Sequence, residues 1–220
     1  MRAATAVVAA LLVVGCGQGR SNSFASFDAK CAELPATRFR IATMPLTYTR
    51  DHSRTIDELT VLGGNTPDRY TTFGLTTVRF GHETDIDLRV LEDTAGSRAC
   101  GTASVSVSLS MQPVVVHVGN ELARRPCAHD ATLAHELKHV ESFRAVLGEA
   151  ARDLRGDFAA AIGTGGRRAS HRHELEGSLH AQIKAYLSTF IAQWQREMTA
   201  RQDAIDTESE RTRVAGSCGR

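Results

Sequence analysis

Two histidines and a glutamate in the segment His135-Glu136-Leu137-Lys138-His139 have the residue types and the spacing of a metal site. Residues four apart lie on one face of a helix, so His135 and His139 can bind one ion through their imidazole nitrogens. The carboxylate of Glu136, on an adjacent face, can reach a metal-bound water without binding the metal itself. The pattern predicts hydrolytic chemistry with a Zn2+ cofactor, two histidine ligands and Glu136 as general base.

A pair of long helices is expected to position this motif. Apolar residues recur at helical spacing after Asp130, a plausible N-cap, as far as Ile162. The segment Gly163–Gly166 should then form a turn, and a second helix should run from Ser170 to about Arg211, packed antiparallel on the first. The competing interpretation of His135 and His139 is a pair of core histidines whose ring nitrogens are bonded to neighbouring side chains.

The third metal ligand is expected on the second helix. If both helices are straight, the residue level with the motif lies as far beyond Ser170 as Glu136 lies before Ile162, which indicates Glu197. Glu197 could instead form a helical ion pair with Arg201, four residues on. The other acidic candidates for the ligand are Asp206, Glu208, Glu210, Glu174 and Glu176.

The first half of the chain predicts a sheet, because short segments alternate polar with apolar residues. These segments are residues 38–41, 76–80, 85–90, 104–110 and 114–118. The last two flank Met111-Gln112-Pro113 and suggest a hairpin, while residues 53–62 suggest a short helix. The expected fold class is therefore α+β, with an antiparallel or mixed sheet over residues 31–125 and a helical hairpin over residues 128–212.

The complete His-Glu-x-x-His motif, preceded by strands and followed by a second helix, resembles the zincin metallopeptidases over roughly residues 100–211. No His-x-x-Gly-x-x-His continuation follows the motif, so the metzincin branch is unsupported. The gluzincin branch takes its third ligand, a glutamate, from a later helix. The resemblance implies a zincin-like fold and zinc-dependent hydrolysis of a peptide or protein, with Val114–Val118 as the strand along the edge of the cleft.

The N-terminus predicts export. Residues 1–15 hold one charge and an apolar run that is too short to span a bilayer, which is typical of a signal peptide. The end of this run, Val13-Val14-Gly15-Cys16, resembles the lipobox of bacterial lipoproteins, which implies lipidation of Cys16 and a membrane anchor. Gly17 after the cysteine favours the outer membrane in that family. An ordinary cleaved signal with an incidental cysteine is the alternative.

Polar and small residues over 16–30 should form a tether, which leaves residues 31–220 as a single domain. An oxidising compartment makes two disulfides the default for the four remaining cysteines, and three pairings are open. We favour Cys100 with Cys127 and Cys31 with Cys218. A zinc ion held by four thiolates is the alternative, but the chain has no CxxC pair.

The composition of the chain limits which classes of function are expected. The chain has 26 basic and 25 acidic residues and no basic stripe, so nucleic acid is not an expected partner. Two other functions stay open: a noncatalytic envelope lipoprotein whose helical hairpin is an interaction scaffold, and a hydrolase that cuts an amide in cell-wall peptide. The substrate, the cleavage preference and the oligomeric state do not follow from the sequence.

Overall fold

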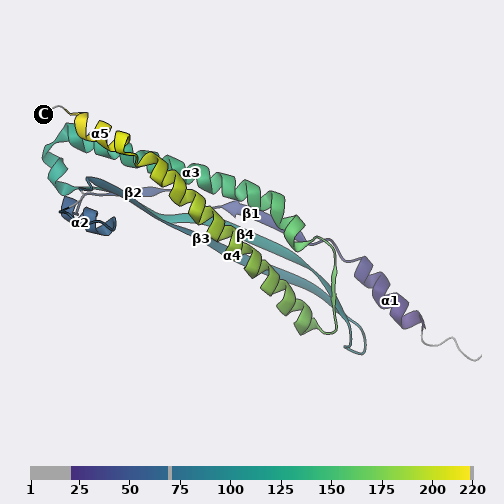
Figure 1. The fold of residues 1–220 in the computed structure, drawn as a ribbon. Helices are drawn as coiled ribbons and strands as arrows, with labels where there is room; N and C mark the ends of the chain where they lie inside the picture. Colours follow the sequence, from purple (N-terminus) through teal and green to yellow (C-terminus); the bar gives the residue numbers. More distant parts are fainter. Residues whose placement is uncertain (1–20, 69–70, 219–220) are drawn as a thin grey trace, which may run out of the picture.

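In a computed structural model of the chain, which describes residues 21–68 and 71–218, one long pair of antiparallel strands runs through an elongated molecule (Figure 1). Strand β3 (Gly74–Glu92) pairs with β4 (Ala99–Val118) along its whole length. The predicted signal peptide and Cys16, the predicted lipidation site, lie outside the described residues. The strand pair therefore sets the long axis along which the other described elements are arranged.

Strand β4 lies in the middle of a mixed five-stranded sheet. Along the edge opposite β3, β1 (Arg38–Thr43) and β2 (Tyr48–Asp51) pair with β4 in parallel, and β5 (Arg167–Ala169) pairs with it antiparallel. Among the described strands, β3 has β4 as its one partner, so its other edge carries no neighbouring strand. This arrangement and the helices below confirm the α+β class.

The hairpin predicted around Met111-Gln112-Pro113 is wrong, because β4 continues through these residues as one strand. Before this point the side chains buried under the helices have odd residue numbers, as in Val107, Leu109 and Met111. After it they have even numbers, as in Val114 and Val116. The register with β3 shifts at the same place, by one extra residue on β4. Proline lacks the backbone N–H that a regular ladder needs, and a bulge accommodates it. Val114–Val118 is consequently a central segment, between β2 and β3, and not a strand at the edge of the sheet.

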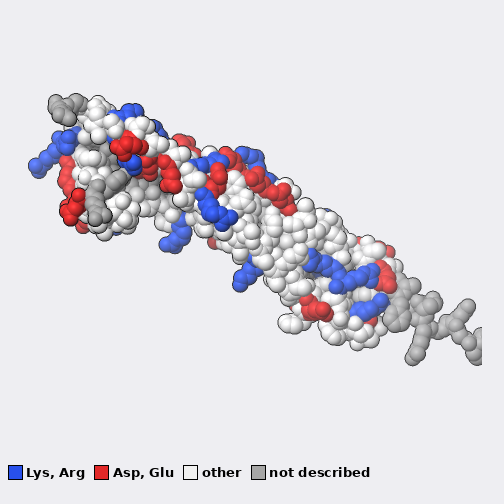
Figure 2. Space-filling model, viewed as in Figure 1, with Lys and Arg blue, Asp and Glu red and all other residues white. Residues whose placement is uncertain are grey.

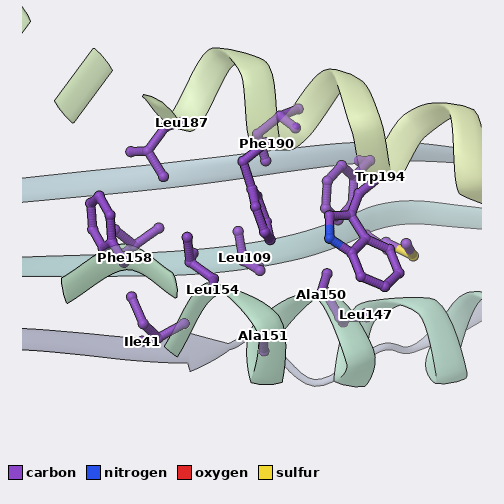
Figure 3. Close-up of a cluster of buried hydrophobic side chains, with 14 of the residues drawn as sticks. Ile41, Leu109, Leu147, Ala150, Ala151, Leu154, Phe158, Leu187, Phe190 and Trp194 are labelled. Carbon is purple, nitrogen blue, oxygen red and sulfur yellow. The ribbon is translucent and has the colours of Figure 1, made fainter. Parts of the chain in front are cut away.

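Helices α3 (Pro126–Ile162) and α4 (Arg172–Ile205) cover one face of this sheet and form the core with it. Figure 3 shows side chains from both helices and from β1 and β4 meeting in this layer. Phe158 of α3 is fully buried there. Its ring centroid lies 4.9 Å from that of Phe39 and 5.2 Å from that of Tyr186. Burial of this apolar layer is what holds the two helices to the sheet.

The helices differ in their ends from the sequence prediction. Helix α3 begins at Pro126, not at Asp130, because proline suits the first helical position, where no backbone N–H donor is needed. Helix α4 ends at Ile205, and a separate helix, α5 (Glu208–Gly216), follows it after Asp206 and Thr207. The Thr207 side chain accepts a hydrogen bond from the Glu210 backbone N–H and so caps α5.

Small helices occupy the two ends of the molecule (Figure 1). Helix α2 (Ile56–Leu62) begins with a capping box formed by Thr55 and Glu58, and a short 3-10 helix (Asn120–Arg124) precedes α3. Helix α1 (Ser21–Ala32), at the opposite end from α5, covers part of the segment expected to be a tether. Phe27 and Cys31 anchor α1, since both are buried and Cys31 is disulfide-bonded to Cys100.

The two disulfides are confirmed, but the pairing we favoured is wrong. Cys31 pairs with Cys100, and Cys127 pairs with Cys218. Cys100 lies near the start of β4, whereas Cys127 follows its end. A 20-residue strand spans about 60 Å, so Cys100 and Cys127 are at opposite ends of the molecule and cannot meet. Each bridge therefore closes one end of the body, and both suit a protein outside the cytoplasm.

The surface formed by α3 and α4 carries charges of both signs. Figure 2 shows Lys and Arg side chains interspersed with Asp and Glu side chains along this face. Within the part of the chain that the structure describes, no helix combines the length and the apolar character needed to cross a membrane.

We expect Phe158→Ala to destabilise the fold by about 3–5 kcal/mol, because it removes a fully buried ring and leaves a cavity between α3, α4 and β1. Urea unfolding followed by the fluorescence of Trp194, the one tryptophan of the chain, measures the loss. Val61→Ala, at a site 62% exposed on α2, is the control and should change the free energy of unfolding by less than about 0.5 kcal/mol. Equal losses in both variants would contradict this account of the core.

Candidate metal site

Helix α3 brings the three motif side chains together as the spacing predicted. His135, Glu136 and His139 are 9%, 3% and 6% exposed, and their ligand atoms lie within 4.8 Å of one another. The Nε2 atoms of the two imidazoles are 3.4 Å apart. These three side chains are close enough together to hold a metal ion. The group is buried, which favours a site over a solvated helix face.

Asp206 supplies a carboxylate oxygen between the two rings. Its Oδ1 lies 3.0 Å from His135 Nε2 and 3.1 Å from His139 Nε2. Asp206 caps the C-terminus of α4, where the chain leaves the helix before α5 begins. The break between the two helices therefore directs this carboxylate at the motif.

The other nitrogen of each ring is bonded to a side-chain oxygen. His135 Nδ1 lies 3.2 Å from Glu210 Oε1, and His139 Nδ1 lies 2.7 Å from Gln202 Oε1. Gln202 is held in turn, because its Nε2 donates to Ser142 Oγ at 3.0 Å. Since a carboxylate can only accept, the Nδ1–H of His135 donates to Glu210. A cation that replaced the proton between His135 Nε2 and Asp206 would then find the Nε2 lone pair available. With the Nδ1–H of His139 donating to Gln202, an ion in the same place would bind both Nε2 atoms, the arrangement common around metal-bound histidines.

The charges of these groups are strongly coupled. The bond to Asp206 raises the pKa of His135 above its usual value, despite burial of the ring. Burial lowers the pKa of His139, but the bonds to Asp206 and Gln202 outweigh it and leave the pKa raised. Burial likewise opposes ionisation of Asp206, yet the two histidines hold its pKa well below the usual range. The three converging atoms thus need positive charge among them, either as protons or as a metal cation.

The separations of the three atoms suit zinc. Ligands about 2.0–2.1 Å from a tetrahedral ion lie about 3.3 Å from one another. The separations of 3.4, 3.0 and 3.1 Å among His135 Nε2, His139 Nε2 and Asp206 Oδ1 are close to that value. Two imidazole nitrogens and one carboxylate oxygen are also a donor set that catalytic zinc sites use. The residues present therefore fit a zinc ion, which His135, His139 and Asp206 would hold.

Glu136 lies beside these atoms and is held by strand β3. Its Oε2 accepts a hydrogen bond from Thr76 Oγ1 at 2.7 Å. Burial raises the pKa of Glu136, while the bond from Thr76 and the nearby histidines oppose the shift. Gly74 makes this approach of β3 to α3 feasible, since a Cβ there would be 2.6 Å from Thr132 Cγ2 and 2.7 Å from Glu136 Oε1. Glu136 is thus a positioned carboxylate with raised basicity, as a general base requires.

A cleft of about 520 Å³ adjoins this group. The start of β3 and the residues before it line one side, and α5 lines the other. The edge strand beside the motif is thus β3, from Gly74 to Thr76, and not the segment Val114–Val118 that the resemblance implied. An extended chain could reach the free edge of β3 and the motif from the same cleft.

The structure does not place Glu197 at the motif. Glu197 pairs with Arg201, whose Nε donates to Glu197 Oε1 at 2.7 Å, as the competing interpretation had it. The error has a measurable origin: Gln182 Nε2 donates to the Ala161 carbonyl oxygen, so residue 182 is level with the end of α3. Helix α4 begins at Arg172, ten residues earlier, and so extends about 15 Å beyond α3. Asp206, and not Glu197, is consequently level with His135.

The remaining acidic candidates lie in other environments. Glu174 accepts from the Ser170 backbone N–H, Glu176 pairs with Arg172, and Glu208 pairs with Arg211. Glu210 contacts His135 through Nδ1, so it supports the site from outside the converging atoms. Its pKa is lowered, chiefly by Arg213 and Lys138, which keep it ionised.

Sequence reasoning missed Gln202 and considered Glu210 only as a metal ligand, and it also missed Thr76 and Gly74. A signal for the first two exists, because Gln202, Asp206 and Glu210 recur every four residues, as His135 and His139 do. Such matched spacing is expected where two antiparallel helices face each other. Thr76 and Gly74 have no local signal, since their roles depend on how β3 meets α3.

We expect Gly74→Ala to destabilise the protein by about 1–3 kcal/mol, because the new methyl group overlaps Thr132 and Glu136 and forces β3 away from α3. Urea unfolding measures the change. Gly81→Ala in the same strand is the control: its Cβ meets one flexible atom, Ser110 Oγ, at 3.3 Å, so the free energy of unfolding should stay the same or rise slightly. Equal destabilisation by both substitutions would show that the contact at Gly74 is not tight.

Comparisons of the chain with protein-family models, with curated proteins and with solved structures found no match. The function must therefore be argued from the site itself. That site is a buried His135-Glu136-His139 group on α3 of an α+β fold, with a further carboxylate from Asp206 and the donor set of a metal centre.

Proposed function

We propose that the protein is a zinc-dependent hydrolase that cleaves an amide bond of a peptide or protein. The observation that carries this proposal is the convergence of His135 Nε2, His139 Nε2 and Asp206 Oδ1 at mutual distances of 3.0–3.4 Å, with the Glu136 carboxylate beside them. A buried pair of core histidines requires neither the third carboxylate at this position nor a separate buried base.

Each residue of the site has a separate role in this reaction. A zinc ion bound by His135, His139 and Asp206 would supply a water of lowered pKa and polarise the substrate carbonyl. Glu136 takes the proton of the attacking water and delivers it to the leaving amine, a role that suits a buried carboxylate whose pKa is raised by burial. Thr76 holds that carboxylate in place through its hydroxyl group. Gln202 and Glu210 fix the orientation of the two imidazole rings.

An extended peptide suits the cleft. The unpaired edge of β3 offers backbone donors and acceptors from Gly74 onward, and these residues line the cleft beside Glu136. A substrate that pairs with this edge as an additional strand would present its amide bonds to the motif in turn. We propose this mode of binding for protein and for cell-wall peptide alike.

Export is proposed on the sequence of the N-terminus and on the two disulfides. Helix α1 lies at the end of the body opposite α5 (Figure 1), and α5 contacts the metal group through Glu210. A lipid on Cys16 would therefore anchor the protein in the outer membrane by one end and present the cleft at the other.

We expect Glu136→Gln to retain zinc and to lower the hydrolysis of a fluorogenic peptide library by about 10²–10⁴-fold, because the amide cannot accept the proton. Glu141→Gln, an exposed position on the same helix, is the control and should keep full activity. Full activity in Glu136→Gln would refute its role as base. Zinc binding without hydrolysis of peptides or cell-wall fragments by the native protein would instead favour the noncatalytic scaffold.

We expect Asp206→Ala to purify with much less zinc than the native protein, because it removes one of three ligands. Glu197→Ala should keep the native content, about one equivalent, since its partner Arg201 also pairs with Glu149. Metal analysis after purification without chelators measures both. Loss of zinc from Glu197→Ala with retention by Asp206→Ala would reverse the assignment, and less than about a tenth of an equivalent in the native protein would overturn the metal site itself.

A further inference from the structure

Helix α5 contacts the metal group although it has little packing of its own. None of its residues, from Glu208 to Gly216, is buried. A helix of nine residues is marginal in water unless other contacts hold it. Apolar burial therefore does not explain why α5 stays against α3.

Covalent and polar contacts hold α5 instead. Cys218, just beyond its C-terminus, is bonded to Cys127 in the first turn of α3, with their Cα atoms 5.6 Å apart. Near its N-terminus, Glu210 contacts both Lys138 and His135 of α3. The segment from Asp206 to Cys218 is thus attached to α3 at both ends, on either side of the exposed helix.

We propose that α5 is a strap that maintains the metal site, with the Cys127–Cys218 disulfide keeping Glu210 on His135 and Asp206 between the two imidazoles. The inference rests on the metal site of the proposed function. Without the disulfide, α5 has no buried residue to hold it, so it detaches from α3 and takes Glu210 with it. Asp206 directly precedes the cap of α5, so its carboxylate also loses its fixed position.

The partners of the Glu210 side chain support this role. Glu210 meets two cations, Lys138 and Arg213, and the ring nitrogen of His135. Such a carboxylate accepts from the Nδ1–H of His135 and fixes the orientation of the imidazole, so that Nε2 is directed at the ion site. A partner of this kind typically contributes a factor of about 10–100 in metal affinity.

The second disulfide provides a matched control. Cys31–Cys100 joins α1 to β4 at the opposite end of the body and contacts no residue of the metal group. Removing either bridge removes one covalent loop, of 69 or 91 residues, so the general loss of stability should be similar. Only the bridge at α5 should affect the affinity for zinc.

The experiment compares the full-length native protein with the variants Cys127→Ser/Cys218→Ser and Cys31→Ser/Cys100→Ser. Competition with a chromophoric chelator gives the zinc affinity, and Trp194 fluorescence confirms that each protein is folded. We expect affinity about 10–100-fold weaker for the first variant and native affinity for the second. Equal affinity of the two folded variants would overturn the strap. A native protein that binds no zinc would overturn the proposed function instead, so the two failures are distinguishable.

Substitutions of Glu210 test the same strap with both disulfides intact. We expect Glu210→Ala to weaken zinc binding by about tenfold or more, and Glu210→Gln, which keeps an oxygen acceptor, to restore most of the loss. Glu208→Ala, an exposed position on the same helix, should bind zinc as the native protein does. The visible absorption of Co2+ bound in place of zinc should shift in Glu210→Ala alone. A lower melting temperature with native affinity and an unchanged spectrum would assign Glu210 a purely structural role and overturn the inference.

Discussion

The alignment of α4 along α3 is the constraint on which the site depends. The two helices are held in this alignment by a continuous apolar layer, in which the Phe158 ring stacks on that of Tyr186. The hydrogen bond from Gln182 to the Ala161 carbonyl oxygen reports the same alignment at the end of α3. A shift of one helical turn, about 5.4 Å, would replace Asp206 by Gln202 at the level of His135. The metal ligands are thus distributed over two helices whose relative position is set far from them, by packing in the middle of the body.

The sequence predicted the part of the site that is local. His135, Glu136 and His139 lie within five residues of one helix, and helical periodicity alone brings them together. Asp206, Gln202 and Glu210 reach the motif only through the alignment of α4, which depends on where β5 and the connecting loop end. A sequence supplies no direct measure of how far one helix extends past another. The assumption that α4 begins level with the end of α3 therefore led to Glu197.

For the fold as well, the local elements were predictable from the sequence and their arrangement was not. Alternation indicated strands and helical periodicity indicated two long helices, because both patterns reflect burial on one face. The continuity of β4 was not predictable in the same way. At a proline, a switch of the apolar positions from odd to even residue numbers fits either a turn or a bulge. The disulfide pairing was missed for the same reason, since continuity of β4 is what separates Cys100 from Cys127.

The bulge beside Pro113 also determines how the chain tolerates changes in length. Downstream of it, Val114 and Val116 face the helices, while His117 points to the other face, where it contacts Asp51. Deleting one residue from the bulge would exchange these faces for the rest of the strand, and a histidine would enter the apolar layer next to α3. A change of one residue in chain length is therefore not tolerable at this irregular point in the middle of the sheet.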